Sequence, residues 1–176
     1  MIQKVLIPTD FTIESLNPVK YLLNSHPPET IFDVTLFFGF RLPESTIELM
    51  YFSKSKLIYD VSNFEFEEAC VHIKKNYTQQ IHALKLDIFT GVNDAAFQNY
   101  LEANHIEKAC VPVKHQLKLP HKRSFDVLPF IYKCSIDIQE VDQSTITWHK
   151  VKEISSPEAK KRSGYTLFGN RPAGNN

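Results

Sequence analysis

Short, continuously apolar runs recur along the chain and predict buried strands. The clearest are Val5–Ile7, Val34–Phe38 and Ala109–Val113, a pattern typical of parallel strands that are covered by helices on both faces. A further strand is expected between His82 and Thr90, and Gly91 ends it. Because these strands are separated by segments of helical periodicity, right-handed β-α-β crossovers and a mainly parallel sheet follow.

Between the strands, apolar residues recur at the spacing of a helix. This periodicity covers residues 16–23, 64–77, 97–104 and 125–132. Polar residues at the starts are candidate N-caps: Thr12 or Ser15 for the first helix, Asn93 or Asp94 for the third and Ser124 for the last. Residues 42–63 are ambiguous, with a short helix expected near Ile47, Met50 and Tyr51 and an irregular connection after it.

The last part of the chain changes character. Ile136 and Ile138 alternate with polar neighbours, which indicates a strand at a sheet edge. A second alternating run over residues 146–151 predicts an antiparallel β-hairpin. The chain is polar beyond residue 155, so we expect one α/β domain over residues 1–152 and a flexible tail over residues 153–176.

Composition narrows the class of protein. Twenty basic residues offset twenty acidic ones, which argues against broad electrostatic binding of nucleic acid. The three cysteines are an odd number at wide spacing, so a reducing compartment is expected. There is no apolar run of about 20 residues, and the apolar run in residues 1–8 is too short for a signal peptide. We therefore expect a cytoplasmic protein without a membrane segment.

Two segments carry a resemblance to a known family. The segment from Val5 to Thr12 reads Val-Leu-Ile-Pro-Thr-Asp-Phe-Thr and is followed by Ser15-Leu16-Asn17 and Lys20-Tyr21; it resembles the opening of universal stress proteins. Residues 91–113 resemble the third helix and fourth strand of the same family, and the similarity covers roughly residues 2 to 141. The resemblance implies a doubly wound sheet of order 3-2-1-4-5. It places a ligand where the order reverses, beside the loops after strands one and four.

The loop after the fourth strand departs from the family pattern. ATP-binding members have the form G-x2-G-x9-G-S/T there, whose glycines let backbone amides approach phosphates. Residues 114–124 contain no glycine. ATP binding in the family's manner is therefore disfavoured, and no cofactor is expected.

Two interpretations of this region stay open. Asp10 matches the family aspartate that faces the nucleotide, but a short acid after a strand also caps the adjacent turn. The loop is basic, so side-chain cations could still hold a nucleotide or other phosphate ligand. The candidate ligand-binding residues are Pro8, Thr9, Asp10, Lys114, Lys118, Lys122, Arg123 and Ser124.

No catalytic constellation is apparent in the sequence. Cys70, Cys110 and Cys134 fall on packed positions without a nucleophile signature, and adding His115 and His121 gives no zinc-ligand spacing. Together with the family resemblance, this implies a non-catalytic stress-response or regulatory module that acts through an unknown protein partner or as a homodimer. The alternative is a protein that binds a phosphate ligand. Relatives often dimerise through the edge strand near residues 135–141, which the 146–151 strand would cover here.

Overall fold

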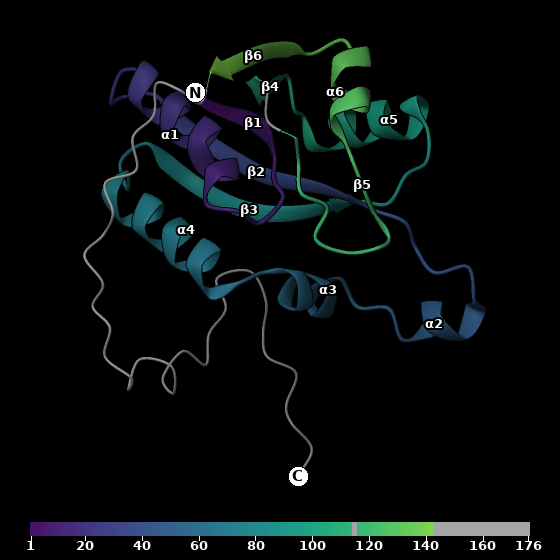
Figure 1. The fold of residues 1–176 in the computed structure, drawn as a ribbon. Coiled ribbons are helices and arrows are strands. Elements are labelled where there is room, and N and C mark those ends of the chain that lie inside the picture. Colours follow the sequence, from purple (N-terminus) through teal and green to yellow (C-terminus); the bar gives the residue numbers. More distant parts are fainter. Residues whose placement is uncertain (114–115, 143–176) are drawn as a thin grey trace, which may run out of the picture.

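The computed structural model describes residues 1–113 and 116–142, which form one sheet of strand order β3-β2-β1-β4-β6 (Figure 1). The parallel strands are β1 (Ile2–Pro8), β2 (Ile31–Phe40), β3 (Ile81–Phe89), β4 (Lys108–Val113) and β6 (Asp137–Asp142). All four neighbouring pairs in this order are parallel. The predicted α/β fold class and its reversal between the first and fourth strands are confirmed.

Seven helical segments connect the strands in the described part of the chain. They are a 3-10 turn (Glu14–Leu16), α1 (Asn17–Ser25), α2 (Thr46–Met50), α3 (Lys54–Val61), α4 (Phe64–Asn76), α5 (Asp94–Asn104) and α6 (Leu128–Lys133). Asn93 caps α5, as predicted, because its side-chain oxygen accepts a hydrogen bond from the Ala96 amide at 2.8 Å.

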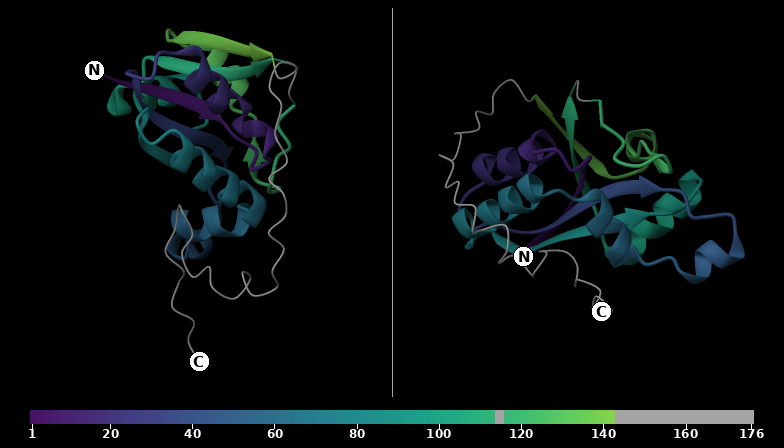
Figure 2. Two further views of the ribbon diagram at one scale, coloured as in Figure 1. Left: turned by 90° about the vertical axis from the view of Figure 1, so that its left-hand side faces the viewer. Right: turned by 60° about the horizontal axis from the view of Figure 1, so that its bottom comes forward.

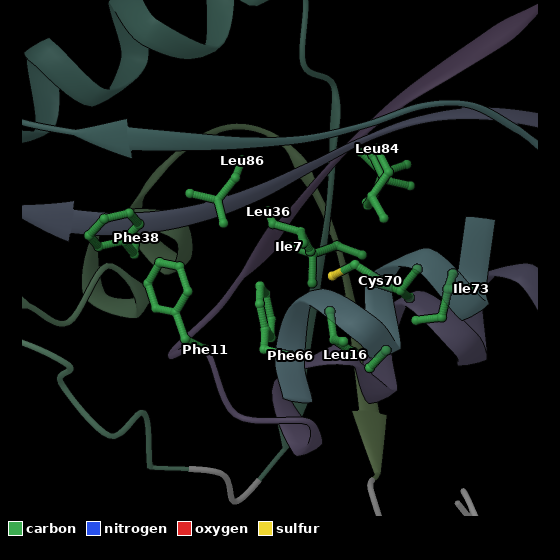
Figure 3. Packing of buried hydrophobic residues seen from close by; sticks show 14 of the residues in the cluster. Ile7, Phe11, Leu16, Leu36, Phe38, Phe66, Cys70, Ile73, Leu84 and Leu86 are labelled. Atoms are coloured by element: carbon green, nitrogen blue, oxygen red, sulfur yellow. The ribbon is translucent and has the colours of Figure 1, made fainter. Parts of the chain in front are cut away.

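Alternate residues along β1 divide the core into two layers. Val5 and Ile7 belong to the cluster that includes α1, α3 and α4, whereas Leu6 belongs to the cluster that includes α5 and α6. Figure 3 shows the first cluster, with residues of α4 packed toward Ile7 and Leu36. Helices thus cover both faces of the sheet, as the continuously apolar strands require.

The prediction that Ser124 caps the last helix is wrong. Ser124–Phe125 forms β5, which pairs antiparallel with Gly39 and Phe40 of β2, so the fifth parallel strand is β6. The helix α6 begins only at Leu128, where the Asp126 carboxylate accepts the Leu128 amide at 2.9 Å.

The stretch after α2 is also more regular than expected. It contains the helix α3, which buries Leu57 and Ile58 against the first core cluster. Neither Thr12 nor Ser15 caps α1, because a 3-10 turn precedes that helix and Leu16 stands at its N-cap without a side-chain bond. The expected hairpin strand over 146–151 and the tail over 153–176 lie outside the described residues.

Candidate functional site

The sheet changes its direction of growth between β1 and β4. Leu6 of β1 lies opposite Ala109 of β4 in a parallel register, so the loops that follow these two strands leave the same edge of the sheet. Here the two loops are in contact: the Lys118 amide donates a hydrogen bond to Oδ2 of Asp10 at 2.9 Å. In open α/β sheets this edge is where ligands bind.

The carboxylate of Asp10 accepts hydrogen bonds from two loops of its own chain. The residue is 4% exposed. Its Oδ1 accepts hydrogen bonds from the Thr12 amide at 3.0 Å and from the Thr12 hydroxyl at 2.5 Å, while Oδ2 accepts the Lys118 amide. This is the geometry of a side chain that closes a turn and fastens a second loop onto it.

The buried hydroxyl groups of Thr9 and Ser15 stabilise the same turn. Ser15 Oγ donates to the Thr12 carbonyl at 2.8 Å and lies 2.8 Å from Thr9 Oγ1. Since the serine proton is committed to that carbonyl, the Thr9 hydroxyl donates to Ser15. Thr9 Oγ1 in turn accepts the Phe11 amide at 3.2 Å. Thr9 therefore stabilises the turn, and Pro8, the last residue of β1, lies opposite Phe37 in β2.

Phe11 has an unusual backbone conformation. Its φ is 62°, in the left-handed region that bulky residues rarely adopt. Its buried ring packs against Phe38 at 4.9 Å and Phe66 at 5.3 Å between ring centroids (Figure 3). Asn63 donates to the Phe11 carbonyl at 2.8 Å and also caps α4. The ring thus fills space beside the carboxyl ends of β1 and β2. No pattern in the sequence indicated this role for Phe11.

The basic residues of the loop after β4 do not all gather at Asp10. Lys118 is exposed and reaches Asp10 through its backbone. Arg123 forms an ion pair with Glu48 of α2 at 2.8 Å, and its carbonyl accepts the Arg41 amide at 2.9 Å. Ser124 is buried, and its hydroxyl has no hydrogen-bond partner among the described residues. Lys114 lies outside the described residues.

A surface hollow of about 460 Å³ lies beside the α2 segment, within the size range of small-molecule sites. It is lined by Arg41, Leu42, Glu44, Ser45, Glu48, Lys122 and Arg123. Lys122 and Arg123 were predicted to share a ligand with Asp10, which does not line this hollow. The loop therefore separates into a part at Asp10 and a part at α2.

The surroundings of the three cysteine thiols disfavour the thiolate form that nucleophilic chemistry needs. Cys70 and Cys110 are fully buried, and burial raises the pKa of the Cys110 thiol to about 12 and that of Cys70 further still. Cys134 is half-buried and donates to the Ile131 carbonyl. In residues 1–113 and 116–142, no three acidic, histidine or cysteine side chains are grouped to hold a metal ion.

A second polar centre, which the sequence analysis also missed, lies near the end of β3. The Asp87 carboxylate forms an ion pair with Lys54 of α3 and accepts hydrogen bonds from Tyr100 of α5 at 2.9 Å and from the Ile88 amide at 2.7 Å. Helices from both faces of the sheet are thereby tied to one strand. The only sequence signal was an acidic residue inside an apolar strand.

Comparison with known proteins establishes the fold. No family model matches the chain, and no curated protein matches it. Among solved structures, the hypothetical protein MJ0577 is 18% identical with a TM-score of 0.50, over 80% of this chain and 95% of that one. A universal stress protein in complex with cAMP is 12% identical with a TM-score of 0.48, over 79% and 96% of the two chains.

A further solved structure is a universal stress protein family protein from Arabidopsis thaliana with AMP bound, 12% identical with a TM-score of 0.45, over 80% and 91% of the two chains. At these identities the likeness extends to the α/β fold, which the chain shares with MJ0577 over four-fifths of its length. None of the helices in the described part of the chain has the length and hydrophobicity needed to span a membrane.

Proposed function

We propose that the chain is a non-catalytic regulatory module of the universal stress protein kind, which acts by binding a partner or a second copy of itself and does not take ATP at the reversal of the sheet. One observation carries the proposal. The carboxylate of Asp10 and the amide of Lys118 are hydrogen-bonded to each other at 2.9 Å. The loop after β4 therefore lies against the loop after β1.

The chemistry of this contact disfavours a phosphate. A phosphate cradle needs backbone amides that are free to point at the anion, whereas the Lys118 amide points at a carboxylate. The negative charge of Asp10 would also repel a phosphate brought to the same amide. Without glycine in residues 116–123, other amides of this loop lack the close approach that glycine permits.

The chemical groups around the contact serve the fold. The Thr9, Thr12 and Ser15 hydroxyls are hydrogen-bonded within the turn. The thiol of Cys110 in β4 is buried and donates weakly to the Pro18 carbonyl. These engagements support a role in binding rather than in catalysis.

Thermal unfolding of the 176-residue chain with and without millimolar Mg-ATP tests the proposal. A ligand present at 100 times its Kd stabilises a protein by about 2.7 kcal/mol, so binding would be seen as a rise in Tm. We expect no rise, and native mass spectrometry should show no retained nucleotide. A rise in Tm that disappears in Asp10→Asn would overturn the proposal.

The hollow beside α2 favours a second candidate function, the binding of a phosphate-bearing ligand away from Asp10. Arg41, Lys122 and Arg123 contribute three cations to its lining, against the two carboxylates of Glu44 and Glu48. If this function is correct, inorganic phosphate or ATP raises the Tm, and the rise is lost in the double variant Arg41→Gln, Lys122→Gln. The exposed Lys85 of β3 provides the control, because Lys85→Gln should keep the rise.

A further inference from the structure

The helix α4 has one buried side and one exposed side. Phe66, Cys70 and Ile73 point into the first core cluster (Figure 3). Figures 1 and 2 show α4 on the outside of the sheet, so its other side is turned away from the strands. On that other side, the side chain of Phe64 is 58% exposed and that of Val71 is 46% exposed. Exposed apolar side chains that lie close together, unlike a single one, indicate a contact surface.

Acidic residues share the exposed side of α4. Glu68 lies four residues after Phe64 and three before Val71, so these three side chains form one row along the helix. Glu65 lies one turn before Glu68, and Asp60 lies in the last turn of α3. The three acids are exposed and have no side-chain partner among the described residues. We call these five residues the α4 surface.

No nearby cation in the sequence offsets these acids. Residues 57–73 contain four acidic residues and no lysine or arginine, and the flanking Lys56 and Lys74 lie in the first turn of α3 and the last turn of α4. The helix α2 also exposes apolar side chains, but three cations lie beside the two glutamates of its hollow and would repel a basic segment. The α4 surface therefore suits a partner that is both basic and apolar.

The sequence beyond the described residues contains such a segment. Six of the 20 basic residues and two of the 20 acidic residues lie in residues 143–176, so this part carries a net charge of +4 and residues 1–142 carry −4. Residues 160–168 read Lys-Lys-Arg-Ser-Gly-Tyr-Thr-Leu-Phe, with three cations, two aromatic rings and no acid. This composition complements the α4 surface in charge and in apolar content.

The connection between the two is long enough. Residues 143–159 can span at most about 60 Å, at roughly 3.5 Å per residue. A domain of about 140 residues has a radius of gyration of about 14 Å. Every face of the domain, α4 included, is therefore within reach of residues 160–168.

We infer that residues 160–168 bind to the α4 surface of their own chain, with their cations toward Glu65 and Glu68 and their apolar side chains over Phe64 and Val71. This inference goes beyond the proposed function and does not depend on it. The bound segment covers the α4 surface, so a basic partner from outside reaches that surface only after the segment has left it. The segment is thus an autoinhibitory contact.

Trypsin cleavage of the 176-residue chain tests the inference, because cleavage after Arg162 requires the segment to leave the α4 surface. The double variant Glu65→Lys, Glu68→Lys brings like charges together and should accelerate this cleavage roughly fivefold, since exposed ion pairs are individually weak. Cleavage after Lys150, outside the segment, should keep its rate. Mass spectrometry gives the initial rate at each site.

The matched control has the same net charge as this double variant. Glu102 belongs to α5, which covers the opposite face of the sheet, and Glu107 precedes β4; both are exposed. The variant Glu102→Lys, Glu107→Lys should therefore be cleaved after Arg162 at the wild-type rate. Circular dichroism of each variant checks that the fold is retained.

A charge exchange tests the assignment of the α4 surface. Lys160→Glu, Lys161→Glu leaves Arg162 as the cleavage site and should be cleaved faster than the wild type. The same tail combined with Glu65→Lys, Glu68→Lys should be protected again, because opposite charges face each other once more. These two chains have the same tail, so any direct effect of the new glutamates on trypsin cancels between them.

Each outcome supports or overturns the inference. Equal rates after Arg162 in the wild type and in Glu65→Lys, Glu68→Lys refute it, and so does a charge exchange that fails to restore protection. Protection that increases with protein concentration shows that the segment comes from a second copy, which refutes binding within one chain. None of these results bears on the Tm experiment with Mg-ATP, so a failure of this inference is distinguishable from a failure of the proposed function.

Discussion

Replacing Phe11 by alanine and by glycine separates the contribution of its ring from that of its backbone. Phe11 is 1% exposed and has a φ of 62°. Removal of a buried phenylalanine ring destabilises a protein by about 3–5 kcal/mol, and both variants should show this loss. They differ in the backbone, because alanine keeps the strain of the left-handed conformation and glycine relieves it.

The expected difference between the two variants follows from two opposing effects. A left-handed backbone costs an L-residue about 1–2 kcal/mol, and glycine is spared this cost. Glycine in turn loses about 0.5–1 kcal/mol relative to alanine through its more flexible unfolded state. We therefore expect Phe11→Gly to be more stable than Phe11→Ala by about 0.5 kcal/mol, or at least equal to it.

Leu22 provides the matched control, because it is fully buried and lies inside the helix α1. At this ordinary helical position Leu22→Gly should be less stable than Leu22→Ala by about 0.5–1 kcal/mol. Urea unfolding at pH 7 gives the free energy of unfolding of all four variants. If glycine is worse than alanine by the same margin at both positions, the strain at Phe11 is absent and the reasoning is refuted.

Two further predictions concern the polar centre at β3 and the contact between β2 and β5. Burial alone would raise the pKa of Asp87, but its hydrogen bonds, led by that from Lys54, outweigh burial and hold the pKa below its ordinary value. The stabilisation is therefore present at pH 7 and is lost as the pH falls through the lowered pKa. Asp87→Asn should lower the free energy of unfolding by about 1–2 kcal/mol at pH 7 and by less in acid, at about pH 3. An equal loss at both pH values in urea unfolding would contradict this. At Gly39, an added Cβ would lie 2.5 Å from a ring carbon and 2.7 Å from the carbonyl oxygen of Phe125, so Gly39→Ala should destabilise the chain by about 1–3 kcal/mol, and an unchanged Tm would show that β5 moves freely.

The features that the sequence predicted well depend on local patterns. β1 and β4 are short apolar runs, and α5 follows an asparagine N-cap and has regular apolar spacing, so each can be identified without knowing its neighbours. The alternation of strands and helices predicted a mainly parallel sheet, whereas the order of the strands was implied by the family resemblance alone. Asn93 acts within its own helix turn, which is why its role could be predicted.

The features that the sequence did not predict depend on residues far apart in the chain. β5 exists because Phe125 meets Gly39, and α3 is helical in part because Leu57 and Ile58 have a core to enter. Likewise, the basic loop appeared to be one cationic cluster, but the pairing of Arg123 with Glu48, 75 residues earlier in sequence, draws part of it to α2. Local composition contains no information on such partners.

The hydrogen bond between Asp10 and Lys118 also has a kinetic consequence. The two groups belong to one chain and lie 2.9 Å apart, so the amide competes for the carboxylate at the high effective concentration of an intramolecular partner. Any molecule that used Asp10 would have to wait until the loop opened. Its association rate would then level off at the opening rate as its concentration increased, and would no longer rise in proportion to concentration.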